Sequence, residues 1–538
     1  MLFAGFLYRS RTKTVPFIGP QRYGCDALLF HINTYKARFP HTVDAYSGFR
    51  FPMDSRPKIL KSPLQELVLL GTVCLGQFLS QGSISMSLST MNIIQEYFEE
   101  KGSGLNSQKV WYMGSYALTL GSFILVSGRL GDLFGLRKIF VFGWFWAALW
   151  SLVTGLSYFS ESSILFIICR AFQGIGFALI IPCGVGILGT TYPNGKRKNF
   201  AFAFFASAAP VGASLSCLMS GMLAQLARWD WAFYCLAIAC AILGSLSIYA
   251  IPGPFRHHNY TLKEAFARFD TWGALLGVAG LVILNFVWNH GPVVGWLTPY
   301  IIVLLVLSVV LLALFFSYEL LFASVPLLPR SVFNLRIGLV LACMSLGWGL
   351  FGVWQYYYWS FMMGFRHYTP VETALTYMPL LILGVVAALI VGHFMSKRTA
   401  PYIIFASMCG FLGGCLFLEF LPVHQSFWHL SFAQMFLLPW GMDCSFPAAS
   451  LILSDFLPEE HQGMAGSLVN TVVNYSVSFF LAVASTVEIE VHKRNNDVLS
   501  SYRSAVYLGV GIAGLAVLVA VVFIFVEHGE HKKIEESD

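Results

Sequence analysis

The chain has 538 residues, of which 57% are hydrophobic and 11% are charged. An ordinary soluble domain carries about 25% charged residues, so this composition excludes that class. A net charge of +6 would suggest nucleic-acid binding in a soluble protein, but the cations here cluster between apolar runs, where they report topology and predict no nucleic-acid partner. The eleven cysteines form no CxxC pair and mostly fall inside apolar runs, so we expect neither a disulfide framework nor a metal site.

The first 62 residues mix Arg, Lys, Pro, Ser and aromatic residues without a regular period. We expect residues 1–62 to form a disordered, basic, cytosolic arm. The ten Lys or Arg residues of this arm fit two roles: contact with anionic lipid, or a solvated tail that helps to orient the first helix.

Fourteen apolar segments follow the arm, and each is long enough to cross the hydrocarbon core, which takes about 20 helical residues. They lack the period-2 alternation of barrel strands, so the predicted fold class is an all-α integral membrane protein with 14 transmembrane helices. The expected spans are 64–90, 109–128, 139–157, 162–190, 199–226, 232–251, 271–290, 299–322, 336–360, 372–395, 400–421, 427–453, 464–488 and 504–526.

The Lys and Arg residues between the spans predict the orientation of the chain. Loops on the side of the termini hold thirteen of them and the opposite loops hold seven, three of which lie in the last opposite loop. Because Lys and Arg accumulate in cytoplasmic loops, we expect a multi-pass protein with both termini cytosolic. The plasma membrane is favoured because no other targeting signal is visible. The sequon at Asn259 then lies in the cytosol and should stay unglycosylated.

A weak internal repeat divides the spans into halves. A shift of 265 residues aligns the fourth span and its exit loop with the twelfth, pairing Gly176 with Gly441, Pro182 with Pro447 and Pro193 with Pro458. Such a shift corresponds to six helices plus two more, as in parallel six-helix halves that flank a central pair. The expected divisions are the arm at 1–62, a first bundle at 63–251, a linker with two extra helices at 252–335, a second bundle at 336–526 and a cytosolic tail at 527–538.

Residues 128–138 read GRLGDLFGLRK and lie between the second and third spans. Their glycines allow a tight turn at the membrane surface, while Asp132 can cap a helix or pair with Arg137. The segment resembles the signature G-x-L-x-D-x-x-G-x-[RK]-[RK] of the major facilitator superfamily, although a solvated turn that obeys the positive-inside rule is the simpler alternative. The resemblance implies a latch between the cytosolic ends of two bundles that opens when the protein changes face. The latch residues would be Gly128, Asp132, Gly135, Arg137 and Lys138.

The fourth and fifth spans carry two further matches to this family. Arg170 begins the segment RAFQGIG, which resembles the family's R-x-x-[QG]-G signature and implies a role in proton coupling. It lies about 12 Å down its helix, where a structural hydrogen-bond hub is the alternative role. The segment AAPVGAS at 208–214 is similar to the antiporter signature G-P-x-G-G, with two glycines replaced by alanine. Pro210 and Gly212 still permit a kink and close packing, which an ordinary packing helix would also use.

Residues 285–296, NFVWNHGPVVGW, look like a segment of the fungal aminotriazole-resistance branch of the fourteen-helix drug:H+ antiporters. Trp288 and Trp296 also fit a plain interfacial aromatic belt. The resemblance implies a major facilitator fold of two six-helix bundles plus two central helices. It also implies alternating access driven by a proton gradient, with no cofactor.

One departure from the family pattern concerns the first helix. Many fourteen-helix antiporters carry an acid there, whereas residues 81–91 read QGSISMSLSTM. The coupling carboxylate is then expected elsewhere, and Asp443 is the candidate because it is the acid deepest in a span. A purely structural Asp443 that pairs with polar neighbours is the alternative. Glu319 and Glu419 lie near span ends and are expected at the interface.

Aromatic and amide side chains suggest a path for the solute, because aromatic faces with a few amides suit amphipathic or cationic molecules. An interfacial belt is again the alternative for the aromatic residues. The path residues are predicted as Gln173, Asn285, Trp288, Trp354, Gln355, Tyr356, Asn470 and Asn474.

These features favour a proton-coupled antiporter that exports small toxic organic compounds and works as a monomer embedded in lipid. A facilitator of a small nutrient or weak acid, such as ammonium or borate, would use the same fold. A polytopic enzyme or sensor is disfavoured, because no intramembrane nucleophile motif or His/Asp cluster and no long cytosolic extension is evident.

Overall fold

The computed structural model describes residues 57, 59–103, 109–193, 196–253, 264, 269–323, 326–328, 330–396, 398–456 and 462–537. Within these ranges, 14 helices are long and apolar enough to cross a membrane, and the regular structure is helical throughout. The expected all-α membrane fold with fourteen spans is confirmed. The sequon at Asn259 and the arm up to Arg56 lie outside the described residues.

The helices follow one another as α2 (Pro63–Glu100), α3 (Lys109–Phe134), α4 (Leu136–Ser160), α5 (Ser163–Thr191), α6 (Lys196–Leu226), α7 (Asp230–Ala250), α9 (Thr271–Val294), α10 (Pro299–Leu321), α11 (Leu335–Gly364), α12 (Pro370–Phe394), α13 (Ala400–Glu419), α14 (Leu430–Phe456), α15 (Gln462–Asn495) and α16 (Val498–Ser537). A short 3-10 turn, Arg330–Val332, precedes α11.

Local sequence explains where several helices begin. The side chain of Ser62 accepts a hydrogen bond from the Gln65 backbone N–H, and Pro63 occupies the first helical turn of α2. Thr369 and Glu372 form a capping box at the start of α12. Three helices run furthest beyond their expected ends: α2 reaches Glu100, α15 reaches Asn495 and α16 reaches Ser537. Their polar last turns lowered the hydrophobicity on which the expected ends were based, but these residues still favour a helix.

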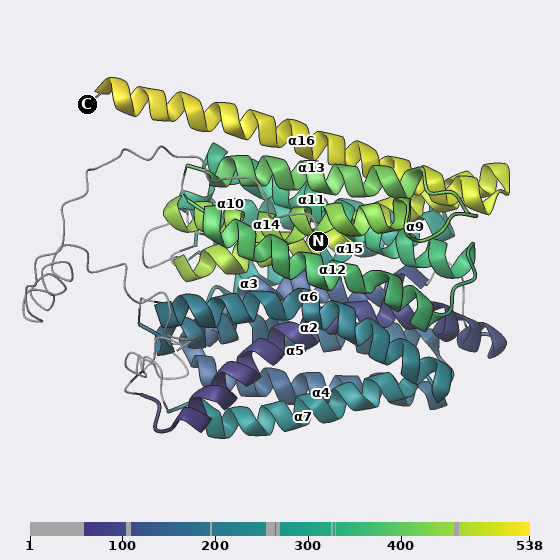
Figure 1. Ribbon diagram of the computed structural model, residues 1–538, viewed down its shortest axis with the longest axis horizontal. Coiled ribbons are helices and arrows are strands. Elements are labelled where there is room, and N and C mark those ends of the chain that lie inside the picture. Colours follow the sequence, from purple (N-terminus) through teal and green to yellow (C-terminus); the bar gives the residue numbers. More distant parts are fainter. Residues whose placement is uncertain are drawn as a thin grey trace, which may run out of the picture. The chain divides into compact units, whose positions relative to one another are not determined.

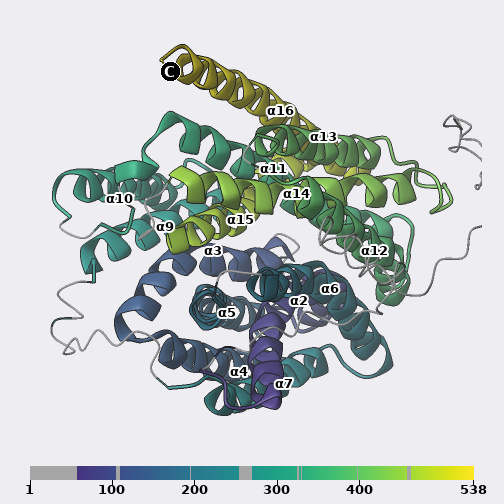
Figure 2. The same cartoon turned by 60° about the vertical axis from the view of Figure 1, so that its left-hand side comes forward.

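The helices gather in two groups (Figures 1 and 2). Helices α2 to α7 pack among themselves, and so do α11 to α16, while α9 and α10 form a hairpin whose α9 contacts α3 and α15. The two large groups meet where α3 packs on α15 and where α6 packs on α12. We call the end of the groups at which α2 begins the near end, and the end at which α2 finishes the far end.

Burial differs between these two ends. Every residue of 82–91 in α2, 112–122 in α3 and 349–363 in α11 is buried, and all three stretches lie in the far halves of their helices. A helix at a lipid-facing surface buries one face only, so these stretches are enclosed by other helices. In the near half of α6, no residue of 202–209 is buried. These far-half stretches of α2, α3 and α11 are therefore enclosed more completely than the near half of α6.

Candidate functional site

Less of the segment 128–138 forms a turn than its sequence predicts. α3 continues through Phe134 and α4 begins at Leu136, so the expected tight turn over the whole segment is wrong. Gly135 alone breaks the helix, at a φ of 101° that glycine adopts freely and other residues do not. One left-handed residue suffices to redirect the chain, which leaves the rest of the segment helical.

Two glycines of this segment lie at helix crossings. A Cβ atom on Gly131 would lie 2.8 Å from Cys183 Sγ on α5. A Cβ atom on Gly128 would lie 3.3 Å from Ser467 Oγ on α15, which belongs to the other helix group. The segment therefore touches the second group through Gly128, and only small residues fit there.

Arg137 of this segment is hydrogen-bonded within the first helix group. Arg137 Nη2 donates a 2.5 Å hydrogen bond to the carbonyl of Ile248, in the last turn of α7, where a cation also complements the helix dipole. Asp132 and Lys138 are exposed. The bond of Arg137 ties α4 to α7 within one helix group, while Gly128 contacts Ser467 of the second group.

Arg170 is fully buried and bonded on all sides. Its Nε donates to the carbonyl of Tyr112 (3.2 Å), its Nη2 donates to the carbonyl of Ser83 (2.7 Å), and its Nη1 donates to Gln173 Oε1. The guanidinium also lies 4.7 Å from the centre of the Tyr116 ring. These bonds join α2, α3 and α5.

The bonds of Arg170 also account for the missing acid in residues 81–91 and for the position of Gln173. No acidic side chain of the described residues forms an ion pair with it. The stretch 81–91 lacks an acid and meets the guanidinium with a backbone carbonyl instead. Gln173 completes the cluster by donating to Ser151 Oγ on α4 (2.6 Å), so it lies with Arg170 and away from the aromatic path residues.

Asp443 lies where three helices meet. Its Oδ2 is buried and has no hydrogen-bond partner among the described residues. A Cβ atom on Gly384 of α12 would lie 2.7 Å from this oxygen and 3.5 Å from Cβ of Pro210 on α6. Gly212, two residues further along α6, packs so closely on α2 that its Cβ would lie 2.6 Å from the Cα of Phe78. The candidate acid and the proline motif thus face each other across a contact between the two groups.

The aromatic path residues of α11 are enclosed by other helices. Trp354, Gln355 and Tyr356 are each at most 4% exposed, so they form no lipid-facing belt. Trp354 donates to Gln434 Oε1 on α14 (2.7 Å), and Gln355 donates to the hydroxyl of Tyr377 on α12 (3.2 Å). These contacts join α11, α12 and α14 in the far half of the second group.

The remaining path residues follow a different seam, between α9 and α15. Asn285 Oδ1 accepts a hydrogen bond from Ser478 Oγ (3.3 Å), and the carbonyl of Trp288 accepts one from Thr486 Oγ1 (3.3 Å). Asn474 donates its amide to the carbonyl of Asn470 one turn earlier (2.9 Å), and Asn470 likewise donates to Gly466 (3.0 Å). The predicted path residues are therefore spread over three places in the structure.

A half-buried acid in α15, Glu488, was missed from the sequence. Tyr357 donates a 2.6 Å hydrogen bond to Glu488 Oε2. Lys109, at the start of α3, lies close enough to interact electrostatically with the same carboxylate. Glu488 stands at the end of the expected span, where an acid normally faces water. No helical apolar spacing in the sequence marks this position, because Val487, Ile489 and Val491 alternate with polar residues.

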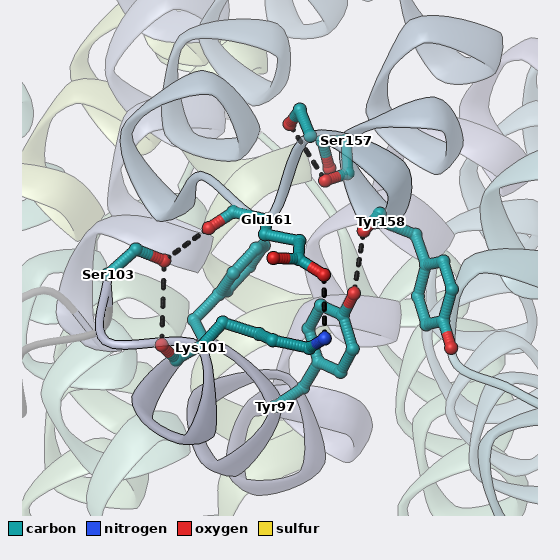
Figure 3. Close-up of polar contacts among 8 residues, drawn as sticks. Tyr97, Lys101, Ser103, Ser157, Tyr158 and Glu161 are labelled. Carbon is teal, nitrogen blue, oxygen red and sulfur yellow. Dashed lines mark hydrogen bonds and ion pairs between the residues drawn. The ribbon is translucent and has the colours of Figure 1, made fainter.

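A polar cluster ties α2 to α4 at the far end (Figure 3). Lys101 Nζ lies 2.6 Å from Glu161 Oε1, and Tyr97 donates to the carbonyl of Tyr158 (2.6 Å). Ser103 Oγ donates to the carbonyl of Glu161 (2.5 Å). The hydrogen bond and charge of Glu161 raise the pKa of Lys101. This cluster fixes one helix group and does not involve the other.

A groove of 760 Å³ opens between α12 and the start of α14; apolar side chains such as Phe427 and Trp428 line most of it, together with Glu372 and Thr376. It contains none of the predicted path residues, although Thr376 is hydrogen-bonded to Tyr358 of α11 (2.9 Å). Among the described residues, no three His, Cys, Asp or Glu side chains are placed to hold a metal ion.

Comparison with known proteins identifies this architecture. The family model of the Major Facilitator Superfamily matches residues 73–482 and 367–538. The chain belongs to the Major Facilitator Superfamily. It is a membrane transporter of this superfamily, as residues 128–138 suggested, and small molecules are the class of substrate.

The transporter is similar to several fungal proteins along most of its length. It is 43% identical to the aminotriazole resistance protein of Saccharomyces cerevisiae over 86% of this chain and 85% of that protein. It is 41% identical to a low affinity ammonium transporter of the same yeast, over 89% of this chain and 92% of that protein. An efflux pump of Aspergillus terreus is 37% identical over 88% of this chain and 90% of that protein. The likeness to the aminotriazole resistance protein confirms the branch that residues 285–296 indicated.

Proposed function

We propose that this transporter is a proton-coupled antiporter that exports small toxic organic compounds through alternating access. The observation that carries the proposal is the position of Asp443. Its unpaired Oδ2 lies beside Gly384 of α12 and Pro210 of α6, at a contact between the two helix groups. A proton on this carboxyl would bind at the surface along which the groups must move.

The physical link between proton and motion is the cost of burying charge. A neutral carboxyl is far easier to enclose than a carboxylate, because the carboxylate needs donors or water. Protonation of Asp443 therefore favours a closed contact between α6, α12 and α14, and loss of the proton favours a contact that admits water. A solute that binds one of these arrangements better shifts the equilibrium between them.

The orientation follows from the distribution of Lys and Arg. With both termini in the cytosol, the near end faces the cytosol and the far end faces the exterior of the plasma membrane. The segment from Gly128 to Lys138 lies at the cytosolic end, where the contact of Gly128 with Ser467 acts as the latch. Since one chain contains both helix groups, the monomer is the working unit.

Arg170 acts on coupling indirectly in this proposal. Its guanidinium is saturated by carbonyl oxygens and Gln173, so it holds α2, α3 and α5 together and carries no exchanging proton. The solute would bind between the groups, with Trp354, Gln355, Tyr356 and Asn474 as the candidate contacts. The resistance named for the yeast relative supports a toxic organic compound as the solute.

The test uses the purified transporter in liposomes with an imposed pH gradient and a labelled candidate compound such as aminotriazole. Asp443→Asn should abolish accumulation driven by the gradient but retain exchange of labelled for unlabelled compound, because exchange needs no net proton release. Glu490→Gln, a change of a half-exposed acid of α15 that pairs only with Lys493 among the described residues, is the control and should behave as wild type. Gradient-driven transport at the wild-type rate in Asp443→Asn would refute the role of Asp443.

An ammonium facilitator is the second candidate, and the 41% identity to a low affinity ammonium transporter favours it. Cells that lack their own ammonium transporters separate the two functions. Uptake of methylammonium that persists in Asp443→Asn would support the facilitator. Resistance to toxic compounds without methylammonium uptake would support the exporter.

A further inference from the structure

Two acidic side chains meet at the near end of the α9–α10 hairpin. Asp270 precedes α9 and is 8% exposed, while Glu319 lies in the last turn of α10 and is 1% exposed. Glu319 and Glu419 both lie near helix ends, as expected, and both are buried, Glu419 at 3% exposure. Each lies near a helix end that neighbouring segments cover, which the position in the span alone does not show.

One oxygen of each carboxyl of the pair has a clear partner. Asp270 Oδ1 accepts a hydrogen bond from the backbone N–H of Gly273 (2.9 Å), which caps α9. Glu319 Oε2 accepts one from the backbone N–H of Leu328 (3.3 Å), in the segment that leads to α11. The other two oxygens, Asp270 Oδ2 and Glu319 Oε1, are buried and have no hydrogen-bond donor among the described residues.

These two unpartnered oxygens face the same spot. A Cβ atom on Gly273 would collide with Asp270 Oδ2 and would lie 2.6 Å from Glu319 Oε1. The two side chains are within hydrogen-bonding reach of each other. Two carboxylates cannot form that bond, since both only accept. A single proton on Glu319 Oε1, donated to Asp270 Oδ2, satisfies both oxygens at once and removes one of two buried like charges.

We propose that Asp270 and Glu319 form a proton-binding carboxyl pair. In its singly protonated form the pair joins the start of α9 to the end of α10 and, through Leu328, to the segment that leads into the second helix group. Tyr318, next to Glu319 on α10, is a titratable neighbour of both carboxyls, and its hydroxyl is also placed to hydrogen-bond to Asp270. No Lys, Arg or His of the described residues forms an ion pair with either acid.

The sign of the pH dependence follows from the shared proton. The shared proton joins two buried oxygens only in the folded protein, because water solvates each carboxyl of the unfolded chain. The pair therefore stabilises the protein fully at acidic pH, and the stabilisation is lost as the pH rises and the proton leaves. An amide in place of either carboxyl supplies an N–H donor at every pH, so Glu319→Gln and Asp270→Asn should both remove the dependence.

The test uses the purified full chain in detergent and needs no transported solute, so it is independent of the proposed export. Infrared difference spectra between acidic and alkaline pH should show the loss of a protonated carboxyl band in wild type. Both amide variants should lack this component, and their melting temperatures should change less with pH than that of wild type. Glu419→Gln is the matched control, because Glu419 Oε2 is also buried without a partner in the described residues; the band should persist in this variant.

Three results would overturn the proposal that Asp270 and Glu319 share a proton. Both amide variants could retain the wild-type difference band, or both could retain the wild-type pH dependence of melting. A melting temperature that rises with Na⁺ or Mg²⁺ in wild type but not in Glu319→Gln would assign the site to a metal cation instead. Asp270→Asn keeps an oxygen that can cap α9, so it remains informative if Glu319→Gln fails to fold.

Discussion

Replacing Arg170 by alanine should destabilise the transporter severely. The change removes the donors of the Tyr112 and Ser83 carbonyls and of Gln173 Oε1, all inside a helix bundle that water does not reach. A buried acceptor that loses its partner costs about 1–3 kcal/mol. Three acceptors lose their partner at once, but removing the buried charge offsets part of this cost. The expected destabilisation is therefore about 3–5 kcal/mol.

The assay is the melting temperature of the purified protein in detergent, followed by the loss of the monodisperse fraction on heating. Arg170→Lys keeps the charge but cannot reach three acceptors with one ammonium, so it should fall between wild type and Arg170→Ala. Arg494→Ala, which replaces an exposed arginine at the end of α15, is the control. It should change the free energy of unfolding by no more than about 0.5 kcal/mol and so leave the melting temperature nearly unchanged. Arg170→Ala that melts like wild type while proton-driven transport is lost would refute the structural role and favour direct proton coupling.

Three further changes test single features. Gly135→Ala places a side chain at a φ of 101°, so it should cost about 1–3 kcal/mol of stability in a thermal melt, and an unchanged melt would contradict a strained turn. Gly121→Val would bring a Cβ to 2.8 Å from the Cα of Tyr475 on α15, which should separate α3 from α15 and lower both stability and transport rate; wild-type transport would exclude this contact as essential. Lys101→Met removes an exposed ion pair with Glu161, so melting and transport should hardly change, and a large loss of either would show that the cluster does more than fix α2 to α4.

The fold could be predicted from sequence because it depends mainly on properties of single segments of the chain. Length and hydrophobicity decide whether a segment spans the membrane, and all fourteen expected spans correspond to helices. The ends were less predictable where polar residues continue a helix, as from Met91 to Glu100 in α2. The turn at 128–138 was overestimated because several glycines suggested flexibility, whereas only Gly135 has a left-handed backbone.

The site was harder to predict because it depends on contacts between distant segments. The sequence singled out Arg170 and Asp443 through their depth in apolar helices. It could not show that Arg170 is saturated by the carbonyls of Tyr112 and Ser83, or that Asp443 faces Gly384. The burial of Glu319 was also invisible, since position within a span says nothing about which helix covers its end.

The most direct test of alternating access is a reversible cross-link at the far end. A Cβ atom on Gly221 of α6 would lie 3.3 Å from Cβ of Pro370 on α12, close to the separation found in disulfides. In a double variant, Gly221→Cys with Pro370→Cys, oxidation should stop proton-driven transport and reduction should restore it, because the far ends of the two groups can no longer separate. Full transport by the quantitatively cross-linked protein would contradict the account.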